Sequence, residues 1–436
     1  MKFLFSIIYQ VAIHLLTLCL APKLIYDYVR YGKYRTSLRK RLGRDFPKIS
    51  NLQGRKVIWF HAVSVGETKA IAPLVKLWRE KDPQAFLLIS SVTETGHAEA
   101  KRSIKEANAY IYLPLDLPYI IKPLVRAIRP DRIIICETDL WYNFLSSAKR
   151  LGARIAVVNG KISERSFGRY FWIKGWAQYL LNLPEMWCLQ SEVYKERFLQ
   201  LGLKEKKLRV TGNLKLDHVE TEMAYEQKVE FKETLGLQNE SLTIVVGSTH
   251  PKEEKLILQS LKALWSQLPT LKVILVPRHP ERFNEVAQLL KKLNLSFSRY
   301  SQEIKPDSQV ILIDTMGLLK QCYQVADVAI VAGSFVPIGG HNIMEPAAYG
   351  VPTIYGPYMH KQPDFLEMMR THQGGIQVTV DTLYQTILEL SLDSQLRKEQ
   401  GLIGKQVYLA QQGALQRTWN HLESLESQQK GRVCNS

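Results

Sequence analysis

The chain has 436 residues, of which 46% are hydrophobic and 23% are charged. Domains usually hold about 100 to 200 residues, so this length exceeds one ordinary core and two domains are expected. With 58 lysines and arginines against 41 acidic residues, the net charge of +17 predicts an anionic partner or working surface, such as nucleic acid or acidic lipid. The cysteines form no C-x-x-C pair, which argues against a disulfide framework or a zinc site and favours reduced thiols. They are Cys19, Cys136, Cys188, Cys322 and Cys434.

The amino-terminal segment, residues 1–22, predicts a membrane anchor that is retained. Residues 3–21 are apolar except at four positions, and their number approaches the ~20 residues that cross a hydrocarbon core. No A-x-A-like cleavage pattern is present and Pro22 follows directly, so a cleavable signal peptide is not expected.

The charges around this segment predict its orientation. Only Lys2 precedes it, whereas many basic residues follow, so the positive-inside rule keeps the remainder of the chain in the cytoplasm. The same basic run suits anionic lipid headgroups. The alternative is a buried amphipathic helix with a solvated basic face. The basic residues are Lys23, Arg30, Lys33, Arg35, Arg39, Lys40, Arg41 and Arg44.

Past the anchor, short β-branched runs alternate with helical patterns such as residues 67–80 and 120–128. This alternation predicts a parallel sheet with helices on both faces. A charged helical stretch, residues 217–241, interrupts the strands, after which the alternation restarts. The expected strands are residues 57–61, 86–90, 110–113, 132–136, 154–158, 186–189 and 208–211, and then 243–246, 273–276, 310–313, 328–331, 353–355 and 375–378.

The interruption divides the chain into two α/β lobes, 23–220 and 221–410, followed by a carboxyl-terminal helix and polar tail, 411–436. In such sheets ligands bind beyond the carboxyl ends of the strands. The residues that directly follow each strand are therefore the candidates for a site.

The first strand ends in His-Ala-Val-Ser-Val-Gly-Glu over residues 61–67. Gly66 lets the backbone pass close to a ligand, and Glu67 opens a helix. A carboxylate at a helix start either complements the helix dipole or serves as an ionised general base that faces the cleft.

Three more polar clusters follow strands of the first lobe. Glu137 comes directly after strand 132–136 and is expected to point into the crevice, and capping by Asp139 explains only part of this cluster. Residues 159–166 form either a loop with a helix cap or a ligand site. Lys215 lies near the lobe junction, where a lysine either meets a phosphate or is simply solvated.

In the second lobe, the small-residue turn at residues 247–250 suits an anion. Two prolines fix a short turn at residues 277–280, where Arg278 offers a bidentate grip on phosphate. Met316 either holds a base with its flat apolar side chain or fills the core.

The most informative segment runs from Gly339 to Gly350. Paired glycines lead to a helix start, and Asn342 and Glu345 stand three residues apart on one face. A capping box would also place an acid there, but it does not require the double glycine. We therefore interpret Glu345 as a carboxylate that accepts both ribose hydroxyls of a nucleotide. Neither G-x-G-x-x-G nor G-x-x-x-x-G-K-[ST] occurs between a strand and a helix, which argues against a dehydrogenase or an ATPase.

These motifs, in this order and over nearly the whole chain, resemble the bacterial 3-deoxy-D-manno-octulosonic acid (Kdo) transferases that act on lipid A. The chain departs from the usual pattern at Asp139, commonly Glu, and at Tyr142, commonly Pro. Neither change removes an acid or the tryptophan, so only acceptor detail is affected. The motifs are the anchor, His-Ala-Val-Ser-Val-Gly-Glu, Glu-Thr-Asp-Leu-Trp, Ser-Glu-Arg-Ser, Gly-Asn-Leu-Lys, Pro-Arg-His-Pro and Gly-Gly-His-Asn-x-x-Glu-Pro.

The resemblance implies the GT-B architecture, in which the first Rossmann-like lobe binds the acceptor and the second binds the nucleotide sugar. It implies CMP-Kdo as donor, a lipid A precursor (lipid IVA) as acceptor, and an inverting transfer at the cytoplasmic side of the inner membrane, next to anionic lipid.

Within this family pattern Glu67 is expected to be the base, and Glu137 and Lys215 match positions assigned to transition-state stabilisation. No cofactor and no essential metal are expected, because lysine, arginine and amide dipoles can neutralise one leaving phosphate, and no D-x-D pair ends a strand. No nucleic acid partner is expected. The expected donor-binding residues are Pro277, Arg278, His279, Met316, Gly317, Leu318, Asn342, Ile343, Met344 and Glu345.

Two other functions remain open from the residues alone. Another GT-B enzyme of lipid A or peptidoglycan assembly would share the fold and the membrane location but select UDP. A non-catalytic basic protein that binds nucleic acid or lipid would explain the charge, but not the polar clusters after the strands.

Overall fold

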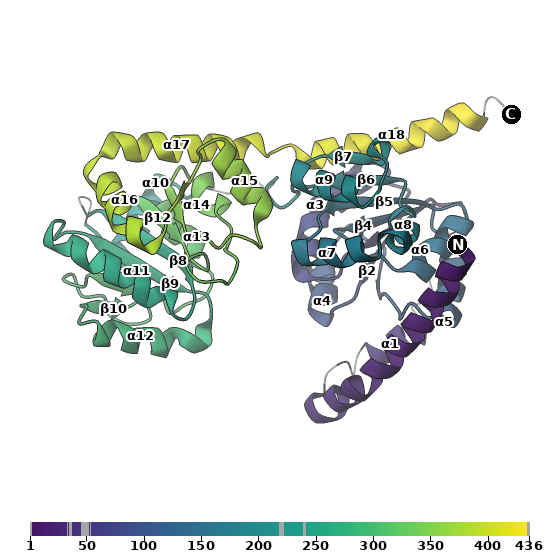
Figure 1. The fold of residues 1–436 in the computed structure, drawn as a ribbon, viewed down its shortest axis with the longest axis horizontal. Coiled ribbons are helices and arrows are strands. Elements are labelled where there is room, and N and C mark those ends of the chain that lie inside the picture. The colour runs from purple at the N-terminus through teal and green to yellow at the C-terminus, as the bar shows by residue number, and fades with distance from the viewer. Residues whose placement is uncertain are drawn as a thin grey trace. The chain divides into compact units, whose positions relative to one another are not determined.

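The computed structural model describes residues 2–32, 34, 37–44, 52, 54–217, 222–238 and 241–433. Lys33 and Arg35 of the basic run, parts of the 217–241 stretch and Cys434 lie outside the described residues. The chain forms two compact units: Met1–His218 together with Gly413–Ser436, and Val219–Gln412. Each unit is built on a seven-stranded parallel sheet with helices packed against it (Figure 1).

The sheet of the first unit has the strand order β3-β2-β1-β4-β5-β6-β7. The direction in which strands are added reverses between β1 and β4, and open α/β sheets bind ligands at such a reversal. All seven strands expected from the sequence are present, within two residues at each end. They are β1 Val57–His61, β2 Phe86–Ser91, β3 Ala109–Tyr112, β4 Arg132–Cys136, β5 Arg154–Gly160, β6 Met186–Leu189 and β7 Leu208–Val210.

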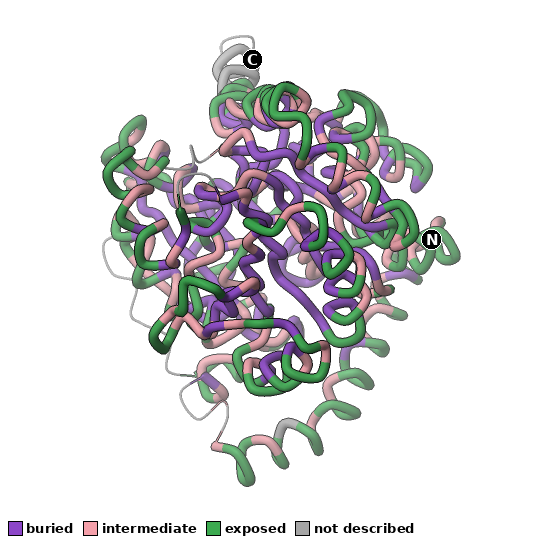
Figure 2. Tube along the Cα trace, turned by 90° about the vertical axis from the view of Figure 1, so that its left-hand side faces the viewer, coloured by how far each residue is buried: buried purple, intermediate pink, exposed green. Residues whose placement is uncertain are grey.

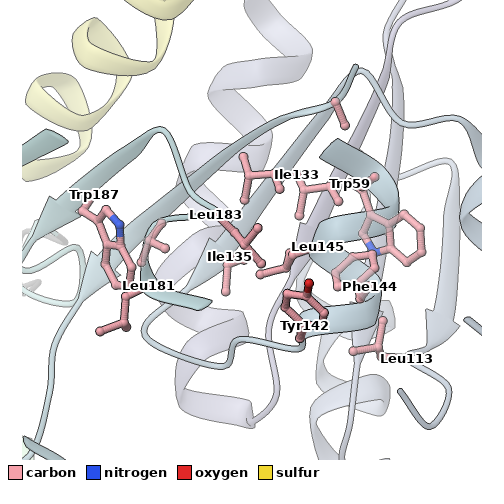
Figure 3. Close-up of a cluster of buried hydrophobic side chains, with 14 of the residues drawn as sticks. Trp59, Leu113, Ile133, Ile135, Tyr142, Phe144, Leu145, Leu181, Leu183 and Trp187 are labelled. Atoms are coloured by element: carbon pink, nitrogen blue, oxygen red, sulfur yellow. The ribbon is translucent and has the colours of Figure 1, made fainter. Parts of the chain in front are cut away.

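Both faces of this sheet are covered, so strands such as β1 and β4 are nearly continuous apolar runs and do not alternate between apolar and polar residues. Trp59 belongs to the buried cluster on one face, and its neighbours Ile58 and Phe60 belong to the cluster on the other. The rings of Trp59 and Phe144 pack 4.7 Å apart in the first cluster (Figure 3). The helices are α3 Val65–Lys81, α4 Glu94–Ser103, α5 Pro118–Ile128, α6 Tyr142–Arg150, α7 Glu164–Trp172, α8 Lys174–Leu181, α9 Glu192–Gln200 and η1 Glu205–Lys207.

The sheet of the second unit has the order β10-β11-β9-β8-β12-β13-β14, and its buried strands stand out from the exposed outer faces of the helices (Figure 2). The six expected strands are present, and the structure adds the three-residue edge strand β10 Phe297–Arg299, which was not predicted. The others are β8 Thr243–Thr249, β9 Lys272–Pro277, β11 Val310–Leu312, β12 Val328–Val331, β13 Thr353–Tyr355 and β14 Ile376–Gln377. The helices are α10 Tyr225–Thr234, α11 Glu253–Lys262, η2 Ala263–Ser266, η3 Pro280–Arg282, α12 Phe283–Lys292, α13 Leu319–Gln324, α14 Met344–Ala348, α15 Pro363–Thr371, α16 Val380–Leu392 and α17 Ser394–Ala410.

The last helix, α18 Ala414–Val433, returns to the first unit and lies along it (Figure 1). The Asp217 carboxylate accepts hydrogen bonds from the N–H groups of Gly413, Ala414 and Leu415, and so caps the start of this helix. Further along, the ring of Trp419 packs edge-on against Trp78 of α3, with centroids 5.2 Å apart.

Two arginines of the sheet also hold α18. Arg132 donates to the carbonyl oxygen of Leu422 at 3.0 Å, and Arg154 donates to that of Leu425. The first unit therefore includes residues from both ends of the chain.

At the other end of the chain, α1 Lys2–Tyr31 is long and apolar enough to cross a membrane, by length and composition. A short helix, α2 Leu38–Arg41, follows it. Phe5 and Ile13 of α1 are buried, whereas most of its other apolar side chains are exposed.

Replacement of Trp419 by alanine tests how firmly α18 is bound. A buried tryptophan truncated to alanine usually costs 3 kcal/mol or more, so we expect the free energy of unfolding of the first unit to fall by about 3 kcal/mol. Urea denaturation of the full chain measures this change. The exposed Gln416→Ala on the same helix should stay within about 0.5 kcal/mol of wild type. Equal stability of the two variants would contradict tight docking of α18.

Candidate active site

Glu67 lies in the first turn of α3, and its carboxylate is bound to the loop before it. Oε2 accepts the Val63 N–H at 2.9 Å, and Oε1 accepts the Ser64 hydroxyl at 2.9 Å. Ser64 Oγ in return accepts the Glu67 N–H. The hydrogen bonds of Glu67 are thus those of a carboxylate at a helix start, which was one of the two alternatives for this residue.

The same carboxylate is also suited to exchange a proton. Burial raises the pKa of Glu67, and the negative charge of Glu137 raises it further, while the hydrogen bonds from Val63 and Ser64 oppose this rise. A raised pKa makes a carboxylate a stronger base, so the bonding does not exclude the expected catalytic role.

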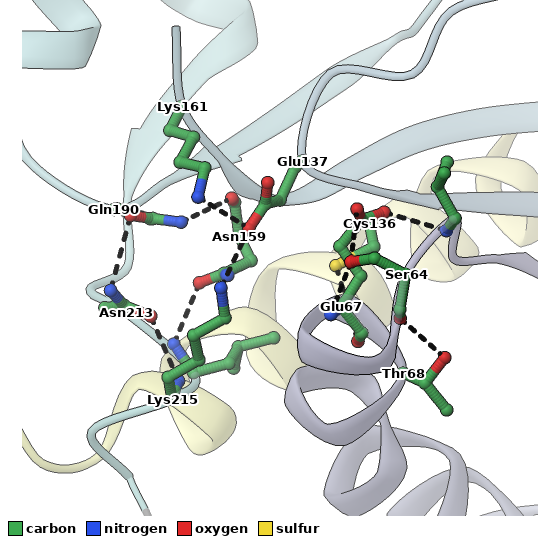
Figure 4. Close-up of polar contacts among 12 residues, drawn as sticks. Ser64, Glu67, Thr68, Cys136, Glu137, Asn159, Lys161, Gln190, Asn213 and Lys215 are labelled. Carbon is green, nitrogen blue, oxygen red and sulfur yellow. Dashed lines mark hydrogen bonds and ion pairs between the residues drawn. The ribbon is translucent and has the colours of Figure 1, made fainter. Parts of the chain in front are cut away.

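Glu137 directly follows β4 and holds two lysines. Its Oε1 lies 2.9 Å from Lys161 Nζ and 3.0 Å from Lys215 Nζ (Figure 4). The backbone of Glu137 is left-handed, with φ of 59°, and the Glu137 N–H donates to Val158 O at 2.9 Å. Such strain in a residue other than glycine costs on the order of 1 to 3 kcal/mol and is concentrated at functional sites.

Lys215 is fixed by this ion pair. Burial lowers its pKa, but the Glu137 carboxylate outweighs burial and raises the pKa above the ordinary lysine value. Lys215 therefore remains a cation in the first unit. Lys161, which lies in the 159–166 cluster, pairs with the same carboxylate.

A chain of amide side chains positions Lys215. Asn159 Oδ1 accepts the Leu214 N–H at 2.9 Å, and Asn213 Oδ1 accepts the Lys215 N–H at 3.0 Å. Gln190 links the two, because it donates to Asn159 O and its Oε1 accepts from Asn213 (Figure 4). The ends of β5, β6 and β7 are thereby joined behind the lysine.

For residues 159–166 the structure confirms the loop with a helix cap, and the ligand site stays a prediction. Ser163 caps α7 by accepting the Ser166 N–H, as expected for a loop with a helix cap. Asn159 and Lys161 instead face the Glu137 cluster.

The expectation that Asp139 caps a helix is wrong. The α6 helix has no side-chain cap at its start, and its Asn143 and Phe144 N–H groups donate to the carboxylate of Asp116, each at 2.8 Å. Asp139 Oδ2 instead lies 2.9 Å from His61 Nε2 and accepts the indole N–H of Trp141 at 2.8 Å.

The Asp139 interaction extends into the sheet. His61 is fully buried at the end of β1, and its Nδ1 lies 2.8 Å from Ser90 Oγ. Although burial raises the pKa of Asp139, hydrogen bonds from His61 and Trp141 outweigh it and lower that pKa. Asp139 is therefore ionised, and it lies two residues after Glu137 in the chain.

In the second unit, three imidazoles gather at the carboxyl ends of β8, β9 and β12. The Nε2 atoms of His250 and His341 are 2.7 Å apart and their rings are stacked, and the ring of His279 lies 5.3 Å from that of His250. Burial and neighbouring cations lower the pKa of both His250 and His341 to about 4, so this pair is neutral near pH 7 and shares one N–H.

The turn at residues 247–250 is not open to an anion at the His250 amide, contrary to expectation. The carboxylate of the fully buried Glu253 accepts the N–H groups of His250 at 2.8 Å and Gly333 at 2.7 Å. Burial raises the pKa of Glu253 to about 7, although these bonds oppose the rise.

The structure excludes one of the two interpretations of Met316, and contact with a base stays a prediction. Its side chain is 54% exposed, so it does not fill the core. Arg278 is exposed after β9, its N–H donates to Thr249 O, and Pro277 before it is buried in the strand. His279 is half-exposed, with Nδ1 3.6 Å from a Glu281 carboxylate oxygen.

Asn342 and Glu345 are in contact, as expected. Asn342 Nδ2 lies 3.4 Å from Glu345 Oε1, and Asn342 Oδ1 accepts the Met344 N–H at 3.1 Å. The side chains of Ile343 and Met344 are fully buried, so only their main chain can face a ligand. Leu318 is half-buried and Gly317 is left-handed, with φ of 93°.

Among the residues that the structure describes, no group of three or more His, Cys, Asp or Glu side chains is arranged to hold a metal ion. The expectation of a metal-independent reaction remains a prediction.

Two parallel sheets of this order, with polar clusters at the carboxyl ends of the strands, define the GT-B glycosyltransferase fold. A glycosyltransferase from Rickettsia africae has a similar structure, with a TM-score of 0.60 over 86% of this chain and 98% of that chain. The two are 15% identical, so this likeness shows the fold alone.

Sequence comparison identifies the family. Residues 36–218 match the family model of 3-deoxy-D-manno-octulosonic-acid transferase (kdotransferase). The 3-deoxy-D-manno-octulosonic acid transferase of Chlamydia muridarum is 35% identical over 97% of this chain and 98% of its own length. That of Haemophilus influenzae is 35% identical over 89% of this chain and 91% of its own length. The chain belongs to the Kdo transferase family and is a glycosyltransferase, so the resemblance inferred from the motifs is confirmed.

Two replacements of Asn159 separate its hydrogen bond from its backbone conformation. The residue has φ of 53°, which glycine adopts freely and alanine does not. Asn159→Gly should cost about 1 to 2 kcal/mol of stability, because the buried Leu214 N–H loses its acceptor. Asn159→Ala should cost about 1 kcal/mol more, because its backbone is also strained. Urea denaturation measures both, and equal losses would mean that the left-handed conformation carries no strain.

Proposed function

We propose that this protein transfers Kdo from CMP-Kdo to a lipid A precursor, lipid IVA, with inversion of the anomeric centre. The observation that carries the proposal is the cluster of Glu67, Glu137 and Lys215 in a chain of the Kdo transferase family. We place the reaction at the cytoplasmic face of the bacterial inner membrane, since the net charge of +17 and the apolar α1 suit an anionic lipid surface.

Glu67 is the general base in this mechanism. Its carboxylate takes the proton from the attacking sugar hydroxyl, and the hydroxyl oxygen forms the new bond to the anomeric carbon of Kdo. The bond from that carbon to the phosphate oxygen breaks, and CMP leaves with the electron pair. One displacement inverts the centre, so no second nucleophile is required. The raised pKa of Glu67 supports this role, because a base works best with a pKa near the working pH.

Glu137 and Lys215 stabilise the charges that develop during transfer. A fixed carboxylate favours positive charge on the sugar ring, and fixed ammonium groups favour the negative charge of the leaving phosphate. The Glu137 carboxylate and two lysines are already paired in the structure, so little reorganisation is needed. Lys161 is added to the residues expected from the sequence.

The second unit holds CMP-Kdo in this proposal. The exposed Arg278 guanidinium suits a phosphate, and the exposed Met316 thioether suits the face of a base. Glu345, held by Asn342, accepts the ribose hydroxyls. We expect no essential metal, because lysine and arginine side chains can neutralise a single leaving phosphate.

Transfer of Kdo to lipid IVA, with CMP-Kdo generated in the assay, tests this function directly. Glu67→Gln keeps the size of the side chain but cannot take a proton, so we expect transfer to fall about 100- to 10,000-fold while CMP still raises the melting temperature. The matched control is Glu192→Gln, an exposed acid in the first turn of α9, which should change transfer less than twofold.

Four outcomes would contradict parts of the proposal. A folded wild type without transfer overturns the substrates, and stabilisation by UDP but not by CMP favours another GT-B enzyme. Full activity of Glu67→Gln overturns the base. Activity lost to a chelator and restored by magnesium overturns the expectation of no essential metal.

The pH dependence of transfer should report the coupling between the two acids. A base acts when it is deprotonated, so activity is present above the pKa of Glu67 and is lost as pH falls through it. Because the charge of Glu137 raises that pKa, Glu137→Gln should move the acid limb of kcat/KM to lower pH, in addition to lowering kcat. An acid limb that stays in place or moves upward would show that Glu67 is not the titrating group.

A further inference from the structure

One stripe of α1 is docked on the first unit. Phe5, Tyr9 and Ile13 follow each other at intervals of four residues, so they lie along one face of the helix. The ring of Phe5 packs 5.0 Å from that of Tyr142 and 5.3 Å from that of Tyr179. Figure 1 shows the amino-terminal end of α1 beside α6 and α8, which carry these two tyrosines.

Polar bonds fix this stripe to the start of α6. Tyr9 Oη donates to Asp116 Oδ2 at 2.8 Å, and the amides of Gln10 and Asn143 exchange two hydrogen bonds at 2.5 and 3.1 Å. Asp116 is the same buried carboxylate that caps α6. The helix is therefore held by partners from the interior of the unit.

Docking of this kind is incompatible with a helix that crosses the bilayer. If residues 3–21 spanned the hydrocarbon, Tyr9 and Gln10 would lie about 10 Å along the helix, about a third of the way into a layer ~30 Å thick. Asp116 and the start of α6 would have to follow them there. A carboxylate within the hydrocarbon is strongly disfavoured, and the loops around it would lose the water that satisfies their backbone groups.

The remaining faces of α1 are apolar and exposed, which suits the surface of a leaflet. Val11 and Leu18 are 54% and 70% exposed on the helix, and the nearby turn between α7 and α8 exposes Phe171, Trp172 and Ile173. Exposed apolar side chains gathered on one helix and one turn mark a membrane or protein contact.

Charge favours the membrane as the occupant of this surface. Lys23 and Arg30 are exposed on the same helix, and basic side chains next to an apolar face bind anionic headgroups. Tyr26 and Tyr28 are also exposed beside them, and tyrosine is enriched at the level of the headgroups.

We propose that α1 lies in the plane of one anionic leaflet without crossing it, docked on the first unit, and that the Phe171–Trp172–Ile173 turn enters the same leaflet. This inference rests on the membrane location in the proposed function, but not on the donor, the acceptor or the chemistry. Its consequence is that the loop bearing Glu137, which leads directly into Tyr142 and Asn143, is fixed beside the lipid surface where a glycolipid acceptor resides.

A disulfide between α1 and α6 tests the docked position in membranes. In a chain with Cys19→Ser and Cys434→Ser, Gln10→Cys with Asn143→Cys places two thiols where the amides now touch, and the cross-link changes mobility on a non-reducing gel. The control pair is Val11→Cys with Asn143→Cys, because Val11 faces away from the unit. We expect oxidation to cross-link the first pair, but not the control, in native membranes and in detergent.

The outcomes of this experiment are distinct. A cross-link in detergent but not in membranes would mean that α1 leaves the unit and crosses the bilayer, and no cross-link in either would overturn the docking. Cross-linking as expected in a protein without Kdo transfer would leave this inference standing and overturn the proposed function.

If the Asn143→Cys protein does not fold, labelling of a single thiol in the turn between α7 and α8 tests the membrane contact instead. Trp172→Cys should be protected from an impermeant maleimide in inside-out membrane vesicles until detergent is added, since this side chain is 88% exposed in the protein alone. Leu402→Cys, at an exposed position on α17 of the second unit, should be labelled at once. Equal labelling of both positions without detergent would overturn the membrane contact.

Discussion

The carboxylate of Glu137 joins the carboxyl ends of three strands, and the geometry of the first unit's site depends on it. It follows β4 and pairs with Lys161 after β5 and with Lys215 after β7. The left-handed backbone of Glu137 directs the side chain toward both lysines, and its charge raises the pKa of Lys215 and of Glu67. The negative charge of Glu137 thus keeps Lys215 protonated and makes Glu67 a stronger base.

The parallel sheets explain why polar groups are concentrated at one edge. β1 and β4 are buried on both faces, and apart from His61 at the end of β1 and Arg132 at the start of β4 their side chains are apolar, so most polar positions lie beyond the carboxyl ends. In the second unit polar groups also gather at the carboxyl ends of the strands, but a buried acid there binds the main chain instead of lysines. There the buried Glu253 binds main-chain N–H groups of two loops, and it thereby holds His250 and Gly333 at the ends of β8 and β12.

Features that depend on residues close together in the chain could be predicted from the sequence. Features that depend on contacts between distant residues could not. The strands of both sheets, and the positions of Glu67 and Glu137 just beyond β1 and β4, could be predicted, since β-branched runs and the residues after them are local patterns. The three residues of β10 contain no such run, so this strand was missed.

The role of Asp116 shows the limit most clearly. It caps α6 from 27 residues away, so spacing gave no signal, and the cap was assigned to the nearer Asp139. His61 was visible in the motif, but its bonds to Ser90 and Asp139 require three strand ends to be placed side by side. The exposure of Met316 likewise depends on tertiary structure.

The return of α18 has a consequence for synthesis on the ribosome. The first unit is completed only when the residues after Gln412 emerge, so the whole second unit is translated before Trp419 can cover Trp78. In the interval, the face of the first sheet that carries Ile58 and Phe60 lacks the helix that closes its core. The nascent first unit is therefore a candidate for chaperone binding, and a ribosome that stalls within the second unit would leave this apolar face open.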